Sequence, residues 1–526
     1  MPGQSESGFT SILTPGNFRS LSVQSTDTVR DLALDRVFER IGGSTPTAAH
    51  AFGTLLTAVG DVRYRQDVFR ALEEPALADA VAGFLTSMTA SDRCESAASR
   101  ASGPYLAELW HLNALTGYVA AVENFDEALT AALTQSPVRS TGWDGLQRHV
   151  AVYRASAVFG SLAVRAPRLR EDISQARHNL LIRDGGKVAV AATDDEADLE
   201  QAVLSVFARF RHGEAADHHT VFREPAIDHV QAWILERAAQ IHPGLFSSLV
   251  SLARDTGTYR DPAIARFVDE VPFYLAYLDQ LAPLRRSGLV TCYPTVSTSR
   301  KDMHVTDGWD LALAARAVAQ GDRVVTNDLH LTGPERILVI SGPNQGGKTT
   351  TARMFGQVHY LAALGCPVPG RTAQLSLCDQ VLTVFEREER LDTLEGRLGD
   401  EVDRLHAVFA RATTHTVIVV NELFASTALH DARILTADVL RRICALDALS
   451  ACVTFIDELS RLNEHTVSMV ARVDTDDAAV RTFRVERRVA DGRAYARALA
   501  ARHGLTLDQI RSRLDRSGVA LEEHRP

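Results

Sequence analysis

The stretch Gly342-Pro-Asn-Gln-Gly-Gly-Lys348-Thr349-Thr350, directly behind the apolar run Ile337–Ile340, decides the fold. It has the spacing of a phosphate-binding loop: a glycine, four residues, then Gly-Lys and Ser or Thr. Glycines let successive backbone N–H groups turn toward a phosphate without a clash from Cβ. A helix predicted over Thr350–Leu364 would point its positive end at the same phosphate. The sequence therefore predicts a nucleoside triphosphate site between a strand and a helix.

The residues of this loop have different predicted roles. Lys348 can reach the β- and γ-phosphate oxygens and is a predicted catalytic residue, and the Thr349 hydroxyl can ligate Mg²⁺. The predicted cofactors are therefore ATP and Mg²⁺. The predicted nucleotide contacts are Gly342, Pro343, Asn344, Gln345, Gly346, Gly347, Lys348, Thr349 and Thr350.

A buried strand ending in acidic residues is the second element that a triphosphate site needs. Val417–Val420 is an apolar run of strand type, and Asn421-Glu422 follows it directly. Glu422 is placed to polarise an attacking water; the alternative is an ordinary exposed carboxylate at a strand end. Asn421 stands where an Asp is usual, and its neutral amide oxygen is a weaker partner for Mg²⁺ than a carboxylate. We predict Glu422 as the base and a metal site at Thr349 and Asn421.

The first 300 residues carry mainly helical patterns. Apolar residues recur at helical spacing in Leu34–Ile41 and Ile227–Ile241, and Phe267–Leu281 predicts a helix that Pro272 would kink. Residues 179–183 and 187–192 flank Asp184-Gly185-Gly186 and predict a β-hairpin. An all-helical region with one hairpin suggests long levers with an outlying tip.

From about residue 301 the pattern changes to alternating strands and helices, which is typical of a parallel or mixed sheet covered by helices. The tail after His503 reads as one or two small helices. The predicted domains are residues 1–300, 301–502 and 503–526. The predicted strands are Ile337–Ile340, Val381–Phe385, Val417–Val420, Cys452–Ile456 and Met469–Val473.

Composition narrows the class of protein. With 526 residues, 45% of them hydrophobic, the chain can form more than one core, and no apolar run is long enough to cross a bilayer. The N-terminus lacks the features of a secretion signal. The six scattered cysteines form no CxxC pair, which favours free thiols. We therefore expect a cytoplasmic protein without a membrane segment.

Two charged clusters leave alternatives open. The net charge is −10, but a local basic face is enough to bind nucleic acid, and the arginines of 481–502 are either such a face or a solvated surface. His212, Glu214, Asp217, His218 and His219 are close enough in sequence to bind a divalent ion, although a solvated loop explains them better.

Several of these segments resemble the ATPase domain of the DNA mismatch-repair MutS family. The resemblance lies in the phosphate loop with Pro343 and Asn344, and in the run from Asn421 through Thr427 to Asp431. It extends to Glu401, Ala412-Thr413, Val324-Val-Thr-Asn327-Asp328 and the segment Val485–Gly504. The match covers about the last two-fifths of the chain.

The resemblance implies an α plus α/β protein: a helical lever and clamp region followed by an ABC-type P-loop ATPase domain. It also implies a homodimer in which each subunit completes the other's nucleotide site. Thr427 and Asp431 would belong to the loop that crosses the interface. Gly396 would lie at the signature position facing the partner's γ-phosphate, and Asp457 at the switch position.

Four departures from the family pattern qualify this picture. Asn421 replaces the metal-associated Asp, Gly396 replaces the signature serine, and Asp457 replaces the switch histidine. Slow hydrolysis or a rearranged metal shell is the expected consequence of Asn421. The Phe-x-Glu motif that reads mispairs has no counterpart, so we expect a MutS-like protein without the N-terminal mismatch-recognition domain.

The sequence thus predicts an ATPase. The resemblance implies that it acts as an ATP-dependent clamp on double-stranded DNA, mismatched or branched, in repair or recombination. The alternative is a nucleotide-dependent scaffold with weak ATPase activity that binds a protein partner.

Overall fold

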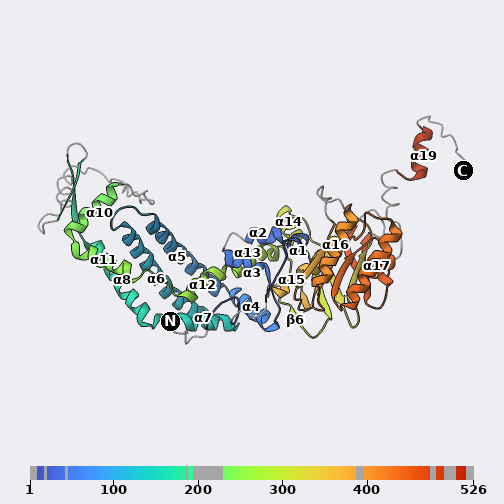
Figure 1. Cartoon of the computed structure of the whole chain (residues 1–526), viewed down its shortest axis with the longest axis horizontal. Coiled ribbons are helices and arrows are strands. Elements are labelled where there is room, and N and C mark those ends of the chain that lie inside the picture. Colours follow the sequence, from blue (N-terminus) through green and yellow to red (C-terminus); the bar gives the residue numbers. More distant parts are fainter. Residues whose placement is uncertain are drawn as a thin grey trace. The chain divides into compact units, whose positions relative to one another are not determined.

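The structure is a computed structural model (Figure 1). It describes residues 9–16, 21–41, 45–183, 187–192, 229–386, 396–473, 481–490 and 505–516. The chain divides into two compact units. Unit 1 is formed by residues 1–9, 71–139 and 143–268, and unit 2 by residues 10–70, 140–142 and 269–526.

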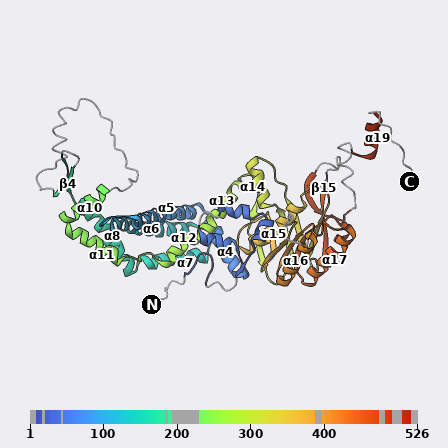
Figure 2. The same ribbon diagram turned by 45° about the horizontal axis from the view of Figure 1, so that its top comes forward.

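Unit 1 consists mainly of long helices. The helices α5 and α6 pack side by side along their length (Figure 2). Phe84 of α5 stacks on Phe125 of α6 with ring centroids 4.2 Å apart, and Phe267 lies 5.7 Å from Phe125. Wholly or largely within unit 1 lie α5 (Pro75–Arg100), α6 (Leu106–Gln135), α7 (Thr141–Arg154), α8 (Ala157–Gln175), α10 (His229–Ile241), α11 (Pro243–Asp255) and α12 (Pro262–Glu270).

The predicted hairpin is present in unit 1. Strands β3 (His178–Arg183) and β4 (Lys187–Ala192) pair antiparallel, with Arg183 opposite Lys187. The turn at Asp184-Gly185-Gly186 lies outside the described residues.

One predicted helix is corrected. Phe267–Leu281 is divided between two helices: α12 ends at Glu270, and α13 (Pro272–Arg286) begins at Pro272. Proline lacks the backbone N–H that a helix interior needs but is well suited to a first turn. Pro272 therefore starts a helix and does not kink one.

A six-stranded sheet forms the centre of unit 2, in the order β12-β13-β14-β9-β15-β16. Neighbouring strands are parallel except β16, which pairs antiparallel with β15. The strand predicted at Cys452–Ile456 lies three residues earlier, because Thr454–Ile456 already turn away. The strands are β9 (Ile337–Ser341), β12 (Val381–Val384), β13 (Val417–Asn421), β14 (Leu449–Val453), β15 (Thr466–Val473) and β16 (Arg481–Arg487).

Helices cover both faces of this sheet. Successive strand side chains point to opposite faces. Val339 and Val420 join a buried cluster with residues of α16 (Gly396–Arg411) and α17 (Leu429–Ala445). Val419 points the other way, toward Gly356 of α15 (Lys348–Ala363). The sheet is therefore the middle layer of an α/β sandwich, and its five parallel strands end at one common edge.

Unit 2 also contains a smaller four-stranded sheet, in the order β6-β11-β7-β8. Three of its strands precede β9 in sequence, and β11 lies between β9 and β12. Only the β6–β11 pair is parallel. Its strands are β6 (Thr295–Ser297), β7 (Met303–Gly308), β8 (Asn327–Leu331) and β11 (Thr372–Ser376); α14 (Leu311–Gln320) lies between β7 and β8 in sequence, and β5 (Thr291–Cys292) pairs with β10 (Val368–Pro369).

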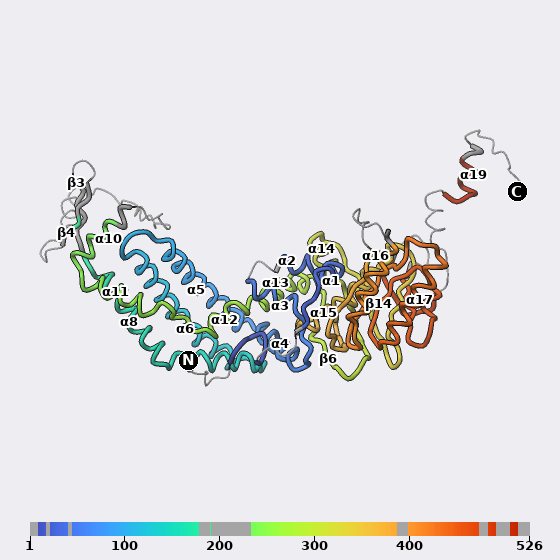
Figure 3. Tube along the Cα trace, viewed as in Figure 1, coloured from blue at the N-terminus to red at the C-terminus, as the bar shows by residue number. Residues whose placement is uncertain are grey.

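The N-terminal segment belongs to unit 2, although its helical pattern placed it with residues 1–300. Val381 of edge strand β12 donates its N–H to Gln24 Oε1 (3.1 Å), and its carbonyl accepts from Thr28 Oγ1 (3.2 Å). Figure 3 shows the blue N-terminal helices beside α13 and α14. These elements are β1 (Leu21–Val23), α1 (Thr26–Asp31), α2 (Asp35–Ile41), α3 (Pro46–Phe52), β2 (Thr54–Leu56) and most of α4 (Val59–Leu72).

The described part of the C-terminal tail is one helix, α19 (Leu507–Arg516). Within the described residues, every helix is too short or too polar to cross a membrane.

Candidate active site

The loop between β9 and α15 has the backbone conformation that its glycines predict. Gly342 and Gly347 have φ of +114° and +95°, values that L residues rarely adopt. A Cβ on Gly342 would lie 3.0 Å from the backbone of Ala471, so the loop also passes too close to β15 for a side chain. Larger residues at these positions would clash or be strained.

The first helical residue after the loop is Lys348. Gly347 caps α15 without a side-chain hydrogen bond. The Lys348 side chain is buried, and its Nζ donates to Gly342 O (2.9 Å) and Asn344 Oδ1 (3.1 Å). The ammonium thus lies across the mouth of the loop, where a phosphate oxygen can replace these neutral acceptors.

Strand β13 brings the predicted metal and base residues to this loop. Thr349 Oγ1 donates to Asn421 Oδ1 at 3.0 Å, and Lys348 Nζ lies 3.8 Å from Glu422 Oε1. The two stretches are about 70 residues apart in sequence. They meet because they follow β9 and β13, parallel strands that are separated in the sheet only by β14. The Glu422 side chain is 29% exposed, so it can meet water while contacting the lysine.

The oxygen groups here fit a magnesium ion better than a softer metal. Thr349 and Asn421 offer a hydroxyl and an amide oxygen side by side, and Mg²⁺ shared with a nucleotide needs few protein ligands. Among the described residues, no group of three His, Cys, Asp or Glu is placed to hold a metal alone. The predicted His212–His219 cluster lies outside the described residues.

Comparison with known proteins matches residues 338–505 to the family model MutS domain V. Residues 338–505 therefore form a MutS domain V. The matched residues begin in β9 and include the phosphate loop, β13 and the Asn421-Glu422 pair.

Individual relatives are similar over part of the chain. The chain is 26% identical to DNA mismatch repair protein MutS of Chlorobium phaeovibrioides over 48% of this chain and 28% of that protein. It is 32% identical to MutS of Brevibacillus brevis over 30% of this chain and 18% of that protein. Endonuclease MutS2 of Gemmatimonas aurantiaca is 28% identical over 35% of this chain and 23% of its own length. The chain thus spans less than a third of these relatives.

The remaining predicted site residues of this MutS domain lie at or near the starts of three helices. Gly396 begins α16, Asp457 begins the 3₁₀ helix η2 (Asp457–Arg461), and Asp431 is exposed on the first turn of α17. Thr427 donates its N–H to Phe424 O in the turn after β13. Their roles toward a partner subunit remain predictions.

Exposed apolar side chains gather around the same elements. Leu429 is 63% exposed, Ile434 44% and Phe455 48%. Arg433 Nη1 lies 3.6 Å from Glu458 Oε2, which places the start of α17 beside η2. The MutS domain therefore exposes apolar side chains on α17 and just after β14, and we call Leu429, Ile434 and Phe455 the outer patch.

Sequence reasoning missed the part of β16 that lies against the phosphate loop. Phe483 has a positive φ of 58°, and its carbonyl lies 3.5 Å from where a Cβ on Gly347 would be. Asn327 bridges to this strand, donating to Phe483 O (3.2 Å) and accepting from Val485 N (2.7 Å). The Asn327-Asp328 pair was the available signal, but no sequence spacing connects it to residue 483.

A cavity of about 590 Å³ is lined in part by β16. Its walls include Val324, Thr326, Thr482 and Arg484.

The described arginines of the 481–502 stretch are largely engaged within the MutS domain. Arg487 forms an ion pair with Glu335, and Arg484 donates to Thr326 O (3.1 Å). Partial burial raises the pKa of Glu335, but the Arg487 guanidinium outweighs it and holds that pKa below its usual value. These contacts favour the surface interpretation for these two arginines; Gly492, Arg493, Tyr495, Ala496, Arg497 and Arg502 lie outside the described residues.

His359 on α15 is a buried histidine of the domain core. Burial lowers the pKa of His359 to about 4, and its Nδ1 contacts Phe355 O at 2.9 Å.

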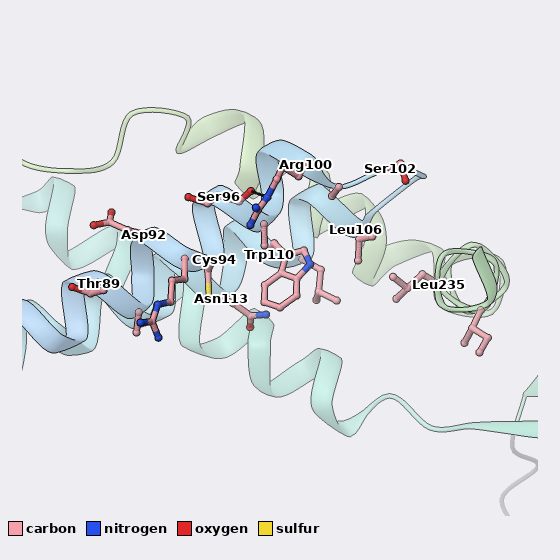
Figure 4. Close-up of a pocket in the computed structure, with 16 residues that line it drawn as sticks. Thr89, Asp92, Cys94, Ser96, Arg100, Ser102, Leu106, Trp110, Asn113 and Leu235 are labelled. Carbon is pink, nitrogen blue, oxygen red and sulfur yellow. Dashed lines mark hydrogen bonds between the residues drawn. The ribbon is translucent and has the colours of Figure 1, made fainter. Parts of the chain in front are cut away.

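Unit 1 contains a larger cavity of about 1430 Å³ (Figure 4). It is lined by α5, α6 and α10, with Trp110, Leu106 and Leu235 among its apolar residues and Arg100 at one end. The Arg100 Nε donates to Ser96 O within the same helix. The cavity has no phosphate-loop pattern, and no function is assigned to it.

Proposed function

We propose that the MutS domain of this protein binds ATP with Mg²⁺ and hydrolyses it, and that the nucleotide state controls how the protein holds double-stranded DNA. The single observation that carries the ATPase part is the convergence of Lys348, Thr349, Asn421 and Glu422 at one sheet edge. The DNA part rests on the relatives, two of which are named for DNA mismatch repair and one as an endonuclease.

Different residues of the chain have different roles in the proposed reaction. The loop amides and the N-terminus of α15 bind the phosphates, and Lys348 exchanges Gly342 O and Asn344 Oδ1 for phosphate oxygens. Glu422 orients a water molecule and accepts its proton as that water attacks the γ-phosphate. Thr349 and Asn421 would hold Mg²⁺, whose charge offsets the charge on the phosphates.

A homodimer is part of this proposal. Leu429, Ile434 and Phe455 are apolar side chains left in water beside Thr427 and Asp431. A second copy of this surface would cover them and bring Gly396, Thr427, Asp431 and Asp457 toward a nucleotide.

The DNA substrate is proposed to be mismatched or branched duplex, bound by unit 1 with its β3–β4 hairpin. The test is the ATPase rate measured with homoduplex, mismatched and branched DNA at one fixed salt concentration, because phosphate contacts make affinity salt-dependent. A change in rate with at least one DNA supports the clamp. Equal rates with and without every DNA would refute its DNA part.

A second candidate is a nucleotide-dependent scaffold that binds a protein partner and hydrolyses ATP only weakly. Asn421 favours it, since an amide oxygen binds Mg²⁺ less strongly than a carboxylate. Tight ATP binding with negligible turnover, on any DNA, would select the scaffold over the clamp.

A further inference from the structure

Glu401 is a buried carboxylate on α16 that no step above uses. Its residue is 9% exposed, and its Oε2 accepts a hydrogen bond of 2.9 Å from the backbone N–H of Phe424. Phe424 lies two residues after Glu422 in the turn that joins β13 to α17. Burying a carboxylate is unfavourable unless hydrogen-bond donors replace the water that it loses. The Phe424 N–H is such a donor, and it lies in the turn after Glu422.

The turn that Glu401 contacts is strained. Glu422 and Phe424 have φ of +53° and +57°, in the left-handed region where glycine is the usual residue. Such residues persist only when their surroundings fix them, and they are frequent at active sites. A strained turn needs contacts that hold it, and Glu401 supplies one to its backbone.

Other contacts hold the same turn from different directions. The side chains of Leu423 and Phe424 are buried in the cluster beneath α16 and α17. Glu422 donates its own N–H to Val453 O at 2.9 Å. Packing therefore holds the side chains of Leu423 and Phe424 in place. Glu401 holds the Phe424 N–H and so restrains the backbone that follows Glu422.

We propose that Glu401 is a positioning residue for ATP hydrolysis, which aims the Glu422 carboxylate by holding the Phe424 amide. This inference rests on the proposed function, in which Glu422 is the base. Glu401 is the sixth residue of α16, whose first residue, Gly396, faces the partner's nucleotide in that proposal. A movement of α16 on closure of the proposed dimer would reach Glu422 through this hydrogen bond.

The test compares Glu401→Ala with Glu401→Gln and with Asp403→Ala, an exposed carboxylate on the same helix. Glu401→Ala removes the acceptor, whereas Gln keeps a carbonyl oxygen at the same reach. ATP affinity is measured with a fluorescent ATP analogue, turnover by phosphate release, and folding by thermal melting. We expect Glu401→Ala to keep its ATP affinity within about twofold and to lose about 10- to 100-fold in kcat. Glu401→Gln recovers most of that loss, and Asp403→Ala matches the wild type.

A double variant separates positioning from general packing. In a Glu422→Gln background, Glu401→Ala should cause no further loss of kcat, because both changes act through the same carboxylate. Independent losses, unchanged turnover in Glu401→Ala, or equal losses of affinity and kcat would each overturn the inference. If the wild-type protein does not hydrolyse ATP, the proposed function is refuted, and this inference with it. If the wild type hydrolyses ATP and Glu401→Ala does so at the same rate, the inference alone is refuted.

Discussion

The phosphate-loop side and the outer side of the MutS domain are organised differently. On the loop side, Lys348, Thr349, Asn421 and Glu422 are already joined by contacts of 3.0 to 3.8 Å. On the outer side, Asp431 is exposed, and it stands among the exposed apolar residues of the outer patch. One side is thus preformed within a single chain, and the other presents exposed groups that the proposed dimer would cover.

This difference separates two kinds of substitution. Changes on the loop side should act on nucleotide binding or chemistry at any protein concentration. Changes on the outer side should act through assembly and should therefore depend on protein concentration. The predictions below test this distinction.

The largest effect is expected for Lys348→Ala. The substitution removes the cation that lies across the loop, and a charge-assisted contact to phosphate is lost. We expect ATP affinity to fall by about 100-fold or more, corresponding to about 3 kcal/mol, as measured by titration with a fluorescent ATP analogue. Lys301→Ala, which alters a lysine outside the loop, is the control. Unchanged ATP affinity in Lys348→Ala would mean that the nucleotide binds elsewhere.

The next effect concerns chemistry and not binding. Glu422→Gln keeps the shape of the side chain but cannot accept a proton, so kcat should fall by about 100-fold or more while ATP affinity stays within a few-fold. Glu464→Gln changes a carboxylate that is 76% exposed and serves as the control. Equal turnover in wild type and Glu422→Gln would assign the base to another group.

The loop side was also the part that sequence could predict. Its geometry depends on local features: glycines that permit positive φ, a lysine at a helix start, and a polar pair at a strand end. The predicted strands at Ile337–Ile340 and Val417–Val420 are confirmed as β9 and β13. Parallel strands end at one edge, so the meeting of Thr349 and Asn421 followed from the sheet alone.

What sequence could not predict depends on contacts between distant segments. Nothing in the sequence around Gln24 and Thr28 indicates that these residues hydrogen-bond to the edge strand β12, or that residues 10–70 group with unit 2. The approach of Phe483 to Gly347 and the hydrogen bond from Phe424 to Glu401 likewise depend on tertiary contacts. Periodicity describes which face of an element is buried but not what covers it.

On the outer side, Leu429→Asp tests whether the exposed residues are a contact surface. A charge at a position that is 63% exposed should leave the folded single chain intact but be unfavourable if a second copy covers it. We expect the dimer dissociation constant, measured by light scattering or sedimentation with ATP present, to rise about tenfold or more. Val23→Asp, at a valine 66% exposed on β1, is the matched control. Equal effects of both variants, or none, would remove the outer patch from the interface and make the two sides of the domain alike.

The smallest effect is expected from Asn421→Asp, which sharpens the loop side itself. Asp has nearly the shape of Asn, so the hydrogen bond from Thr349 Oγ1 at 3.0 Å can be kept while the oxygen gains negative charge. Since Mg²⁺ prefers carboxylate oxygens, the Mg²⁺ concentration that gives half-maximal ATPase should fall about three- to tenfold, with a modest rise in kcat. Asn463→Asp supplies the same charge change away from the loop. If Asn421→Asp behaves like wild type while Asn421→Ala loses activity, the amide oxygen already serves the metal fully. Asn421 would then be a functional substitute for the usual Asp. The proposal of a weakly hydrolysing scaffold would lose its main support.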